Sequence, residues 1–128
     1  MADKGALIVG NLTKNFSRLE FTCRCGCGLD DISPVLIENL QKLRDLVGEA
    51  LHVNSGCRCP AHNAVVGGED HSFHLPENGC KAADIAARHL TPRELKDYAL
   101  QIPAFKGGGI GLYPGFLHVD VRNWISRW

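Results

Sequence analysis

Apolar residues recur at helical spacing in one long stretch of the chain, from residue 34 to residue 48. Ser33 followed by Pro34 is typical of a helix start, and Gly48 is typical of a helix end. Between them the apolar positions fall on one side of a helix, which indicates packing on a core. The pattern predicts a helix over 34–48. Its apolar stripe consists of Leu36, Ile37, Leu40, Leu43, Leu46 and Val47.

A second helix start lies at Thr91. The spacing Thr-x-x-Glu up to Glu94 matches a capping box, and Pro92 occupies the first helical position. These signals predict a helix from residue 91 to about residue 101, just before Pro103. Residues 60–66 predict one or two further helical turns, which the glycines at 67 and 68 would end.

Strict alternation of apolar and polar residues marks the segment 116–122 as a strand. The alternation places His118, Asp120 and Arg122 on one face of that strand. A turn precedes it, so residues 109–122 predict a hairpin. Residues 51–54 predict a short strand. We therefore expect an α+β fold, with a small, mainly antiparallel sheet and helices packed on it.

Small residues surround one carboxylate, Asp84, in the segment 82–87. This composition predicts a buried strand, in which an unpaired charge would be too costly, so Asp84 must be paired or bound to a metal. Residues 1–32 predict an irregular arm, anchored on the core by apolar side chains. The whole chain, 1–128, has the length of one domain. The expected anchors of the arm are Leu12, Phe16, Leu19 and Phe21.

Charge and hydropathy exclude some classes of partner. The chain has 14 Lys and Arg residues against 14 Asp and Glu residues, which is not the basic footprint of a nucleic-acid binder or of an anionic-membrane binder. It contains no apolar run of about 18 residues that could span a membrane. Residues 1–10 lack the features of an export signal, so we expect synthesis in the cytoplasm without secretion by the ordinary route. We also expect a monomer.

Six cysteines are many for a cytoplasmic chain. The run at 23, 25 and 27 is tighter than the usual spacing of zinc-finger thiols. Our first interpretation is that the cysteines are reduced, partly buried thiols. The alternative is a second, structural metal site, built from this run together with Cys57, Cys59 or Cys80.

Candidate metal ligands lie in separate predicted elements. His74 belongs to a turn-rich stretch, Asp84 to the buried strand and His118 to the hairpin. Two imidazoles and a carboxylate can bind zinc and leave a coordination position open for water, as catalytic zinc sites do. Singly, each residue also has an ordinary explanation, namely a surface histidine, a capped carboxylate and a cross-strand pair.

Several short motifs occur in an order that resembles one family of enzymes. Over residues 12–122 the chain is similar to the zinc D-Ala-D-Ala carboxypeptidase and L-Ala-D-Glu endopeptidase family. That family includes bacterial cell-wall peptidases and phage endolysins and shares its fold with the hedgehog signalling domain. The motifs are Phe21-x-Cys-x-Cys-Gly-Cys-Gly28, Ser55-Gly56-x-Arg58-x-Pro60-x-x-Asn63, Gly67-Gly68, Ser72-x-His74, Gly79-x-x-Ala82-x-Asp84, Gly109-x-Gly111-x-Tyr113 and Phe116-x-His118-Val119-Asp120-Val121-Arg122.

The resemblance implies a zinc cofactor bound by His74, Asp84 and His118, and a peptidoglycan peptide as substrate. It also implies that Arg58 holds a carboxylate or carbonyl group of the substrate, a role that suits a planar fork of donors. Ser72 would help to bind substrate or to orient the site.

Two departures from the family pattern affect the site. Nine residues separate His74 from Asp84 instead of the common six, which indicates a small insertion at residues 76–78. Many members also carry an acid three residues before the last histidine, where this chain has Gly115. Asp120 is therefore our leading candidate for the general base or for a residue that orients His118, and an ion pair with Arg122 is its alternative explanation. Weaker candidates for the base are Glu77, Asp70 and His71.

The predicted function is zinc-dependent hydrolysis of a peptide bond involving a D-amino acid in the bacterial cell wall, by a carboxypeptidase or an endopeptidase. A phage or prophage lysis enzyme fits the expected lack of an export signal. A second class is a non-catalytic module that keeps the zinc and binds a cell-wall peptide or a protein. A third is a cysteine hydrolase using Cys57, Cys59 or Cys80, although no helix start marks these thiols as activated.

Overall fold

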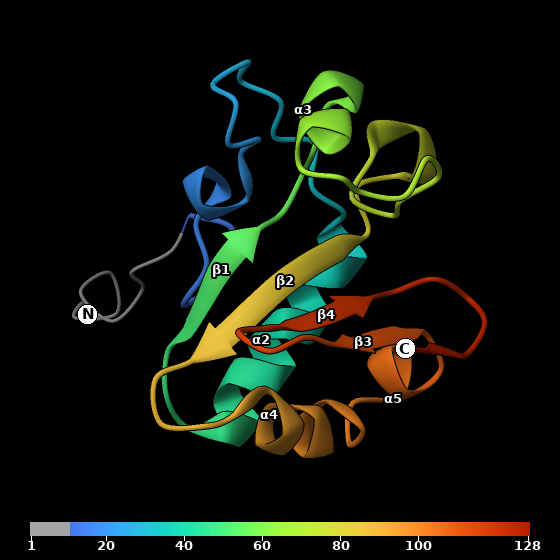
Figure 1. The fold of residues 1–128 in the computed structure, drawn as a ribbon. Coiled ribbons are helices and arrows are strands. Elements are labelled where there is room, and N and C mark those ends of the chain that lie inside the picture. Colours follow the sequence, from blue (N-terminus) through green and yellow to red (C-terminus); the bar gives the residue numbers. More distant parts are fainter. Residues whose placement is uncertain (1–10) are drawn as a thin grey trace.

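A five-stranded sheet forms the centre of the computed structural model, which describes residues 11–128 (Figure 1). Neighbouring strands are antiparallel except for the last pair, β3 and β5, which is parallel. The expected α+β fold with a mainly antiparallel sheet is confirmed. In sheet order the strands are β1 (Leu51–Ser55), β2 (Ala82–Ala87), β4 (Leu117–Asp120), β3 (Gly109–Leu112) and β5 (Ser126–Arg127).

The predicted hairpin over 109–122 is confirmed as β3 and β4, in which Gly111 pairs with His118. Strand β5 was not predicted, because its two residues are too few to show alternation. It is held by the backbone of the last residue, since Trp128 N donates to Ile110 O at 3.1 Å and Leu112 N donates to Trp128 O at 2.8 Å.

The two long helices begin as their sequence signals predict. Helix α2 (Pro34–Val47) has Ser33 as its N-cap, whose hydroxyl accepts from Leu36 N, and Gly48 ends it with a φ of 80°. Helix α4 (Pro92–Ala99) begins with the Thr91 capping box. Short helical segments complete the chain: α3 (Pro60–Val65), α5 (Pro103–Lys106), and the 3₁₀ turns η1 (Arg18–Phe21) and η2 (Pro76–Asn78).

Helix α4 ends at Ala99, slightly earlier than predicted. Leu100 still has a helical backbone, and Pro103 forces the chain out of the helical region by Ile102, which is extended at φ −98° and ψ 112°, because the residue before a proline disfavours helix. Pro103 then occupies the first position of α5, where a missing N–H is harmless.

The two faces of the sheet have different contents. Ile85 of β2 and Leu117 and Val119 of β4 belong to the main hydrophobic core, together with the buried side chains of α2 and α4. The alternate residues, Asp84 and His118, point to the opposite face because successive side chains of a strand alternate. The helical layer and the core therefore cover one face, and the other face carries the polar residues.

The N-terminal arm is partly as predicted. Phe16 and Phe21 are buried and their rings lie 5.8 Å apart, whereas Leu19 is 78% exposed and anchors nothing. Leu19 lies on the outer side of η1, a 3₁₀ turn within the segment that was expected to be irregular. The expectation about an export signal concerns residues 1–10, which lie outside the described part of the chain. Within residues 11–128 no helix has both the length and the apolarity needed to cross a bilayer.

Candidate metal centre

The structure brings His74, Asp84 and His118 together. Asp84 and His118 face each other across β2 and β4, and His74 approaches from the loop that follows α3. Asp84 Oδ1 lies 3.2 Å from His74 Nε2 and 3.1 Å from His118 Nδ1. All three side chains are buried, and one ligand atom from each lies within 4.8 Å of the others.

The insertion before Asp84 folds back on itself, so His74 still reaches the sheet. Residues 76–78 form η2, and the next two residues, Gly79 and Cys80, both have left-handed backbones with φ of 86° and 49°. The loop is closed by a hydrogen bond of 2.8 Å from Lys81 N to Phe73 O. The extra residues therefore lengthen a closed loop without separating the histidine from the aspartate.

Each histidine has a hydrogen-bond partner behind it. His74 Nδ1 lies 2.7 Å from Gly56 O, and His118 Nε2 lies 2.7 Å from Asp120 Oδ2. A carbonyl and a carboxylate only accept, so Nδ1 of His74 and Nε2 of His118 carry hydrogen. The other nitrogen of each ring faces Asp84, which is the arrangement that orients histidines for a metal.

Asp120 is completely buried beside the site. Its carboxylate accepts from Gly109 N at 2.9 Å and from the Arg122 guanidinium at 2.7 and 2.8 Å, as well as from His118. A side chain at Gly109 would collide with this carboxylate, which explains the glycine. Both oxygens are occupied and the residue does not line the cavity. Of the two roles predicted for Asp120, this geometry suits orientation of His118 and does not suit a general base.

Burial and charge move the pKa values of the cluster in different directions. Burial alone would raise the pKa of Asp84, but the hydrogen bond with His118 holds it well below its usual range. Burial lowers the pKa of His74. Burial would also lower the pKa of His118, but the carboxylates of Asp120 and Asp84 raise it. His74 is therefore neutral at pH 7, and Asp84 is charged.

A neutral His74 leaves two acceptors facing each other. Its Nδ1 hydrogen points to Gly56 O, so the lone pair of Nε2 meets Asp84 Oδ1 at 3.2 Å. A cation between the two atoms removes this repulsion. Donors at about 2.0 to 2.1 Å from a tetrahedral zinc lie about 3.3 Å apart, close to the spacing of these atoms. Two imidazoles and one carboxylate thus fit a zinc ion that keeps an open position.

Arg58 extends the charged network to the rim. Its guanidinium donates to Asp84 Oδ2 at 3.0 Å, to Ser55 Oγ at 3.1 Å and to Asn63 Oδ1 at 3.2 Å. An arginine has five N–H donors, so two remain for a ligand. Ser72 also lines the cavity, and its hydroxyl accepts from His74 N at 3.1 Å, which fixes the start of the loop.

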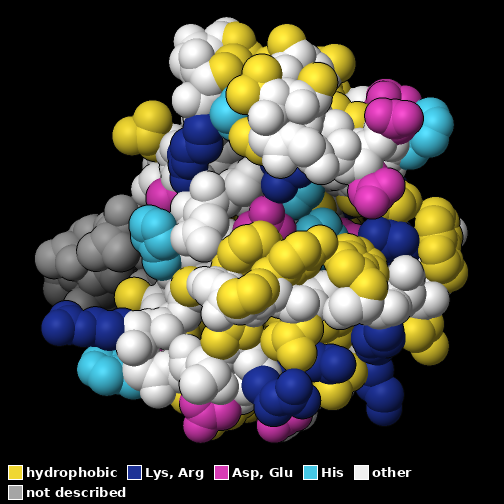
Figure 2. Space-filling view, in the orientation of Figure 1, with side chains coloured by type: hydrophobic (Ala, Val, Ile, Leu, Met, Phe, Trp, Pro, Cys, Tyr) yellow, Lys and Arg dark blue, Asp and Glu magenta, His cyan; other side chains and the backbone are white. Residues whose placement is uncertain are grey.

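An open cavity of about 1040 Å³ lies over the cluster. In Figure 2 the middle of this face is hollowed, with acidic and histidine side chains at the bottom and hydrophobic ones along the lower side. Four aromatic residues line the wall, a placement that the sequence did not predict, although two of them belong to motifs of the family pattern. Trp128 packs over Gly111 of β3 and also lines the cavity. The aromatic residues are Phe73, Tyr113, Phe116 and Trp128.

The weaker candidates for the base lie at different places. Asp70 and His71 are exposed and line the cavity, and so does Glu69, which the sequence did not single out. Glu77 belongs to η2, where its carboxylate lies 3.8 Å from the ring of His71. Contrary to the expectation from the sequence, one of the thiols does lie at a helix start, because Cys59 is the N-cap of α3. No cysteine is among the lining residues in the described part of the chain, however, so the thiols are not placed for hydrolysis in this cavity.

An α+β sheet with a buried His-Asp-His cluster beneath an open cavity defines a class of metal-dependent enzymes. The comparison with known families agrees, because the model of the Peptidase M15 family matches residues 14–120. The chain therefore belongs to the Peptidase M15 family, whose members are zinc metallopeptidases. No curated protein matches the sequence.

Proposed function

We propose that this metallopeptidase hydrolyses a peptide bond next to a D-amino acid in peptidoglycan, and that it acts on the bacterial cell wall. The observation that carries the proposal is that a set of metal ligands and the guanidinium of Arg58 lie side by side at the cavity. The oxygen and nitrogen ligands of one cation lie beside the guanidinium of Arg58, which has two N–H donors left for a carboxylate or carbonyl of a short peptide.

The residues of the site have different roles, which follow from where they lie. His74, Asp84 and His118 hold the zinc, which when bound supplies a Lewis acid that polarises a carbonyl group and activates water. Asp120 holds the His118 ring with its Nδ1 toward Asp84, so that this nitrogen would be free to bind the zinc. Arg58 binds the carboxylate or carbonyl group of the substrate and thereby orients the peptide in the cavity, and Ser72 keeps the His74 loop in place.

Proton transfer needs a group that reaches the cavity. Glu69, Asp70 and His71 line it and are exposed, whereas Asp120 is buried with both oxygens occupied. We assign the proton transfer to this rim segment. Single substitutions to Gln, Asn and Gln, respectively, tell which residue carries it, because only that variant loses turnover while it keeps its zinc and its substrate affinity.

Mass spectrometry of purified peptidoglycan after incubation with the zinc-loaded protein tests the proposal, with a chelator-treated sample as control. Loss of a terminal D-Ala identifies a carboxypeptidase, and a new D-Glu amino terminus identifies an endopeptidase. If several wall types stay intact while zinc is bound and peptide still binds, the protein is a binding module and the proposal fails.

A further inference from the structure

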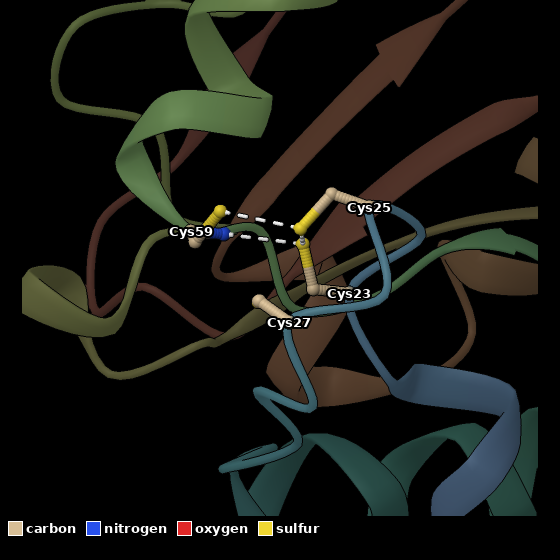
Figure 3. Close-up of side chains that lie close together, drawn as sticks. All are labelled: Cys23, Cys25, Cys27 and Cys59. Carbon is tan, nitrogen blue, oxygen red and sulfur yellow. Dashed lines mark hydrogen bonds between the residues drawn. The ribbon is translucent and has the colours of Figure 1, made fainter.

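Four cysteines converge at a second place, away from the cavity. Cys23, Cys25 and Cys27 belong to the N-terminal arm, and Cys59 is the N-cap of α3 (Figure 3). One sulfur from each lies within 4.8 Å of the other three. The sulfurs of Cys23 and Cys25 are 3.5 Å apart, and those of Cys25 and Cys59 are 3.6 Å apart.

These spacings are close to those of a tetrathiolate metal site. Sulfurs bound at about 2.3 Å to a tetrahedral zinc lie about 3.8 Å from one another. They are too long for disulfide bonds, in which the sulfurs are about 2.05 Å apart. Four thiol groups in contact also have few good partners among themselves, because sulfur is a weak donor and a weak acceptor.

Backbone groups are arranged around the sulfurs as donors. Cys59 N donates to Cys23 Sγ at 3.4 Å, and His62 N donates to Cys59 Sγ at the same distance. Donors of this kind stabilise sulfur that carries negative charge, as thiolates do when they bind a metal. This observation is independent of the clustering of the thiols.

The turn chemistry explains how alternate cysteines face one point. If this segment were a strand, the side chains of Cys23, Cys25 and Cys27 would all point from the same face in a straight row, and they could not surround an ion. Gly26 and Gly28 have φ of 88° and 87°, and the loop closes through a bond of 2.8 Å from Cys23 N to Leu29 O. The positive φ values coil the segment, which is why the tight spacing still permits convergence.

We propose that Cys23, Cys25, Cys27 and Cys59 bind one structural zinc ion in a closed tetrathiolate site, separate from the zinc of the sheet. The four thiols give up their protons on binding. The ion joins the arm to the start of α3, one residue after Arg58, so it fixes the segment from which that arginine reaches Asp84. Cys57 and Cys80 are buried in the hydrophobic core and take no part.

Metal content and cobalt spectra test the proposal without any assay of peptidase activity. We expect two zinc ions per wild-type chain. A Cys25→Ser/Cys27→Ser variant changes only exposed side chains and keeps one ion. Cobalt-loaded wild-type protein should show the intense sulfur-to-metal charge-transfer band of a tetrathiolate, and this band should be lost in the double variant. Cys57→Ser is the matched control and should keep both ions and the band.

A His74→Ala/His118→Ala variant separates this proposal from the proposed function. It should lose the sheet metal and keep the charge-transfer band, whatever the substrate of the enzyme is. One zinc per wild-type chain, with no charge-transfer band, overturns the proposal.

Alkylation gives a second measurement that does not depend on how the variants fold. Cys25 and Cys27 are exposed, so they should react quickly in chelator-treated, reduced protein and many times more slowly after zinc is added. Equal rates with and without zinc overturn the proposal, and so does a mass that shows a disulfide in protein purified without an oxidant.

Discussion

The His74-Asp84-His118 site on the sheet and the cluster of four cysteines in the arm are built in opposite ways. The ligands of the sheet site are buried, lie on two strands and one closed loop, and are hydrogen-bonded to Gly56, Asp120 and Arg58. The sulfurs of the cysteine cluster lie on coiled backbone near the surface and contact mainly one another and two backbone N–H groups.

This difference in burial and in hydrogen-bond partners indicates a different role for the metal ion in each centre. The sheet site is preorganised, and its open cavity suits a metal that must still bind substrate and water. The cluster has four sulfur ligands and no cavity residue among them, so it suits a closed site whose ion stabilises the fold. Substitutions at one centre should therefore leave the metal of the other in place.

The largest effect is expected from Asp84→Asn. The change removes the one anionic ligand, so the sheet zinc and peptidase activity should be lost while the cluster keeps its ion. In the metal-free protein the partly buried guanidinium of Arg58 also loses its charged partner, and we expect a loss of up to about 3 kcal/mol in the free energy of unfolding. Zinc analysis and urea denaturation measure both effects.

The control for this variant is Asp97→Asn, an exposed acid on α4. It should change neither quantity. If Asp84→Asn retains full activity with two zinc ions, the assignment of the sheet site is wrong.

Asp120→Asn should have the next largest effect. The amide cannot replace the carboxylate that faces both His118 and Arg122, so zinc affinity at the sheet should fall about 10- to 100-fold. Competition with a chromophoric chelator measures this. Glu49→Gln is the matched control, because it alters a carboxylate–histidine pair of 3.3 Å at the surface. Equal zinc affinities in the two variants would contradict the role of Asp120 in orienting His118.

Arg58→Lys should change substrate binding more than metal binding. Lysine keeps the charge beside Asp84 but loses the fork of donors that a carboxylate prefers, so we expect KM to rise about tenfold with the zinc content unchanged. Steady-state kinetics on a peptidoglycan peptide measure the rise. Arg93→Lys on α4, an exposed arginine, serves as the control. A fall in kcat with KM unchanged would contradict a substrate-binding role.

The sequence predicted the elements whose signals are local. Caps at Ser33 and Thr91 located the helix starts, and the alternation around His118 located the hairpin. The metal ligands were named as two histidines and a carboxylate on separate elements, and the family pattern supported the same three residues. The loop length between His74 and Asp84 differed from that pattern, and only the structure shows that η2 and two left-handed residues absorb the difference.

Features that depend on distant contacts were beyond the sequence. The alternation placed Asp120 beside His118 but did not show that both carboxylate oxygens are occupied, which decides between its two roles. Leu19 looked like an anchor because it is apolar, yet it lies on the outer side of η1. Glu69 and Trp128 reach the cavity through the path of the chain in space, for which no local signal exists.

The most gradual effect concerns pH, because it changes the zinc affinity by only a several-fold factor for each pH unit, and it distinguishes the two centres. The pKa of His118 is raised by Asp120 and Asp84 although burial opposes this, so protonated His118 stabilises the metal-free protein. That contribution is complete below the unfolded pKa of about 6.5 and is lost as pH rises through the higher folded pKa. The proton on Nδ1 occupies the position that zinc needs, so zinc affinity at the sheet should fall as pH falls.

His74 does not compete in the same range, because burial lowers its pKa. We therefore expect that binding of one zinc ion to the sheet site displaces one proton. The zinc affinity of that site should then fall several-fold, at most about tenfold, for each pH unit below the folded pKa of His118. Chelator competition between about pH 6 and pH 8 in the Cys25→Ser/Cys27→Ser background measures the sheet site alone. When Asp120→Asn is added to this background, the loss of zinc affinity should begin at a lower pH, because one of the two carboxylates that raise the pKa of His118 is gone. A slope of two protons, or an unchanged midpoint in that variant, would show that His118 is not the ligand whose proton zinc displaces.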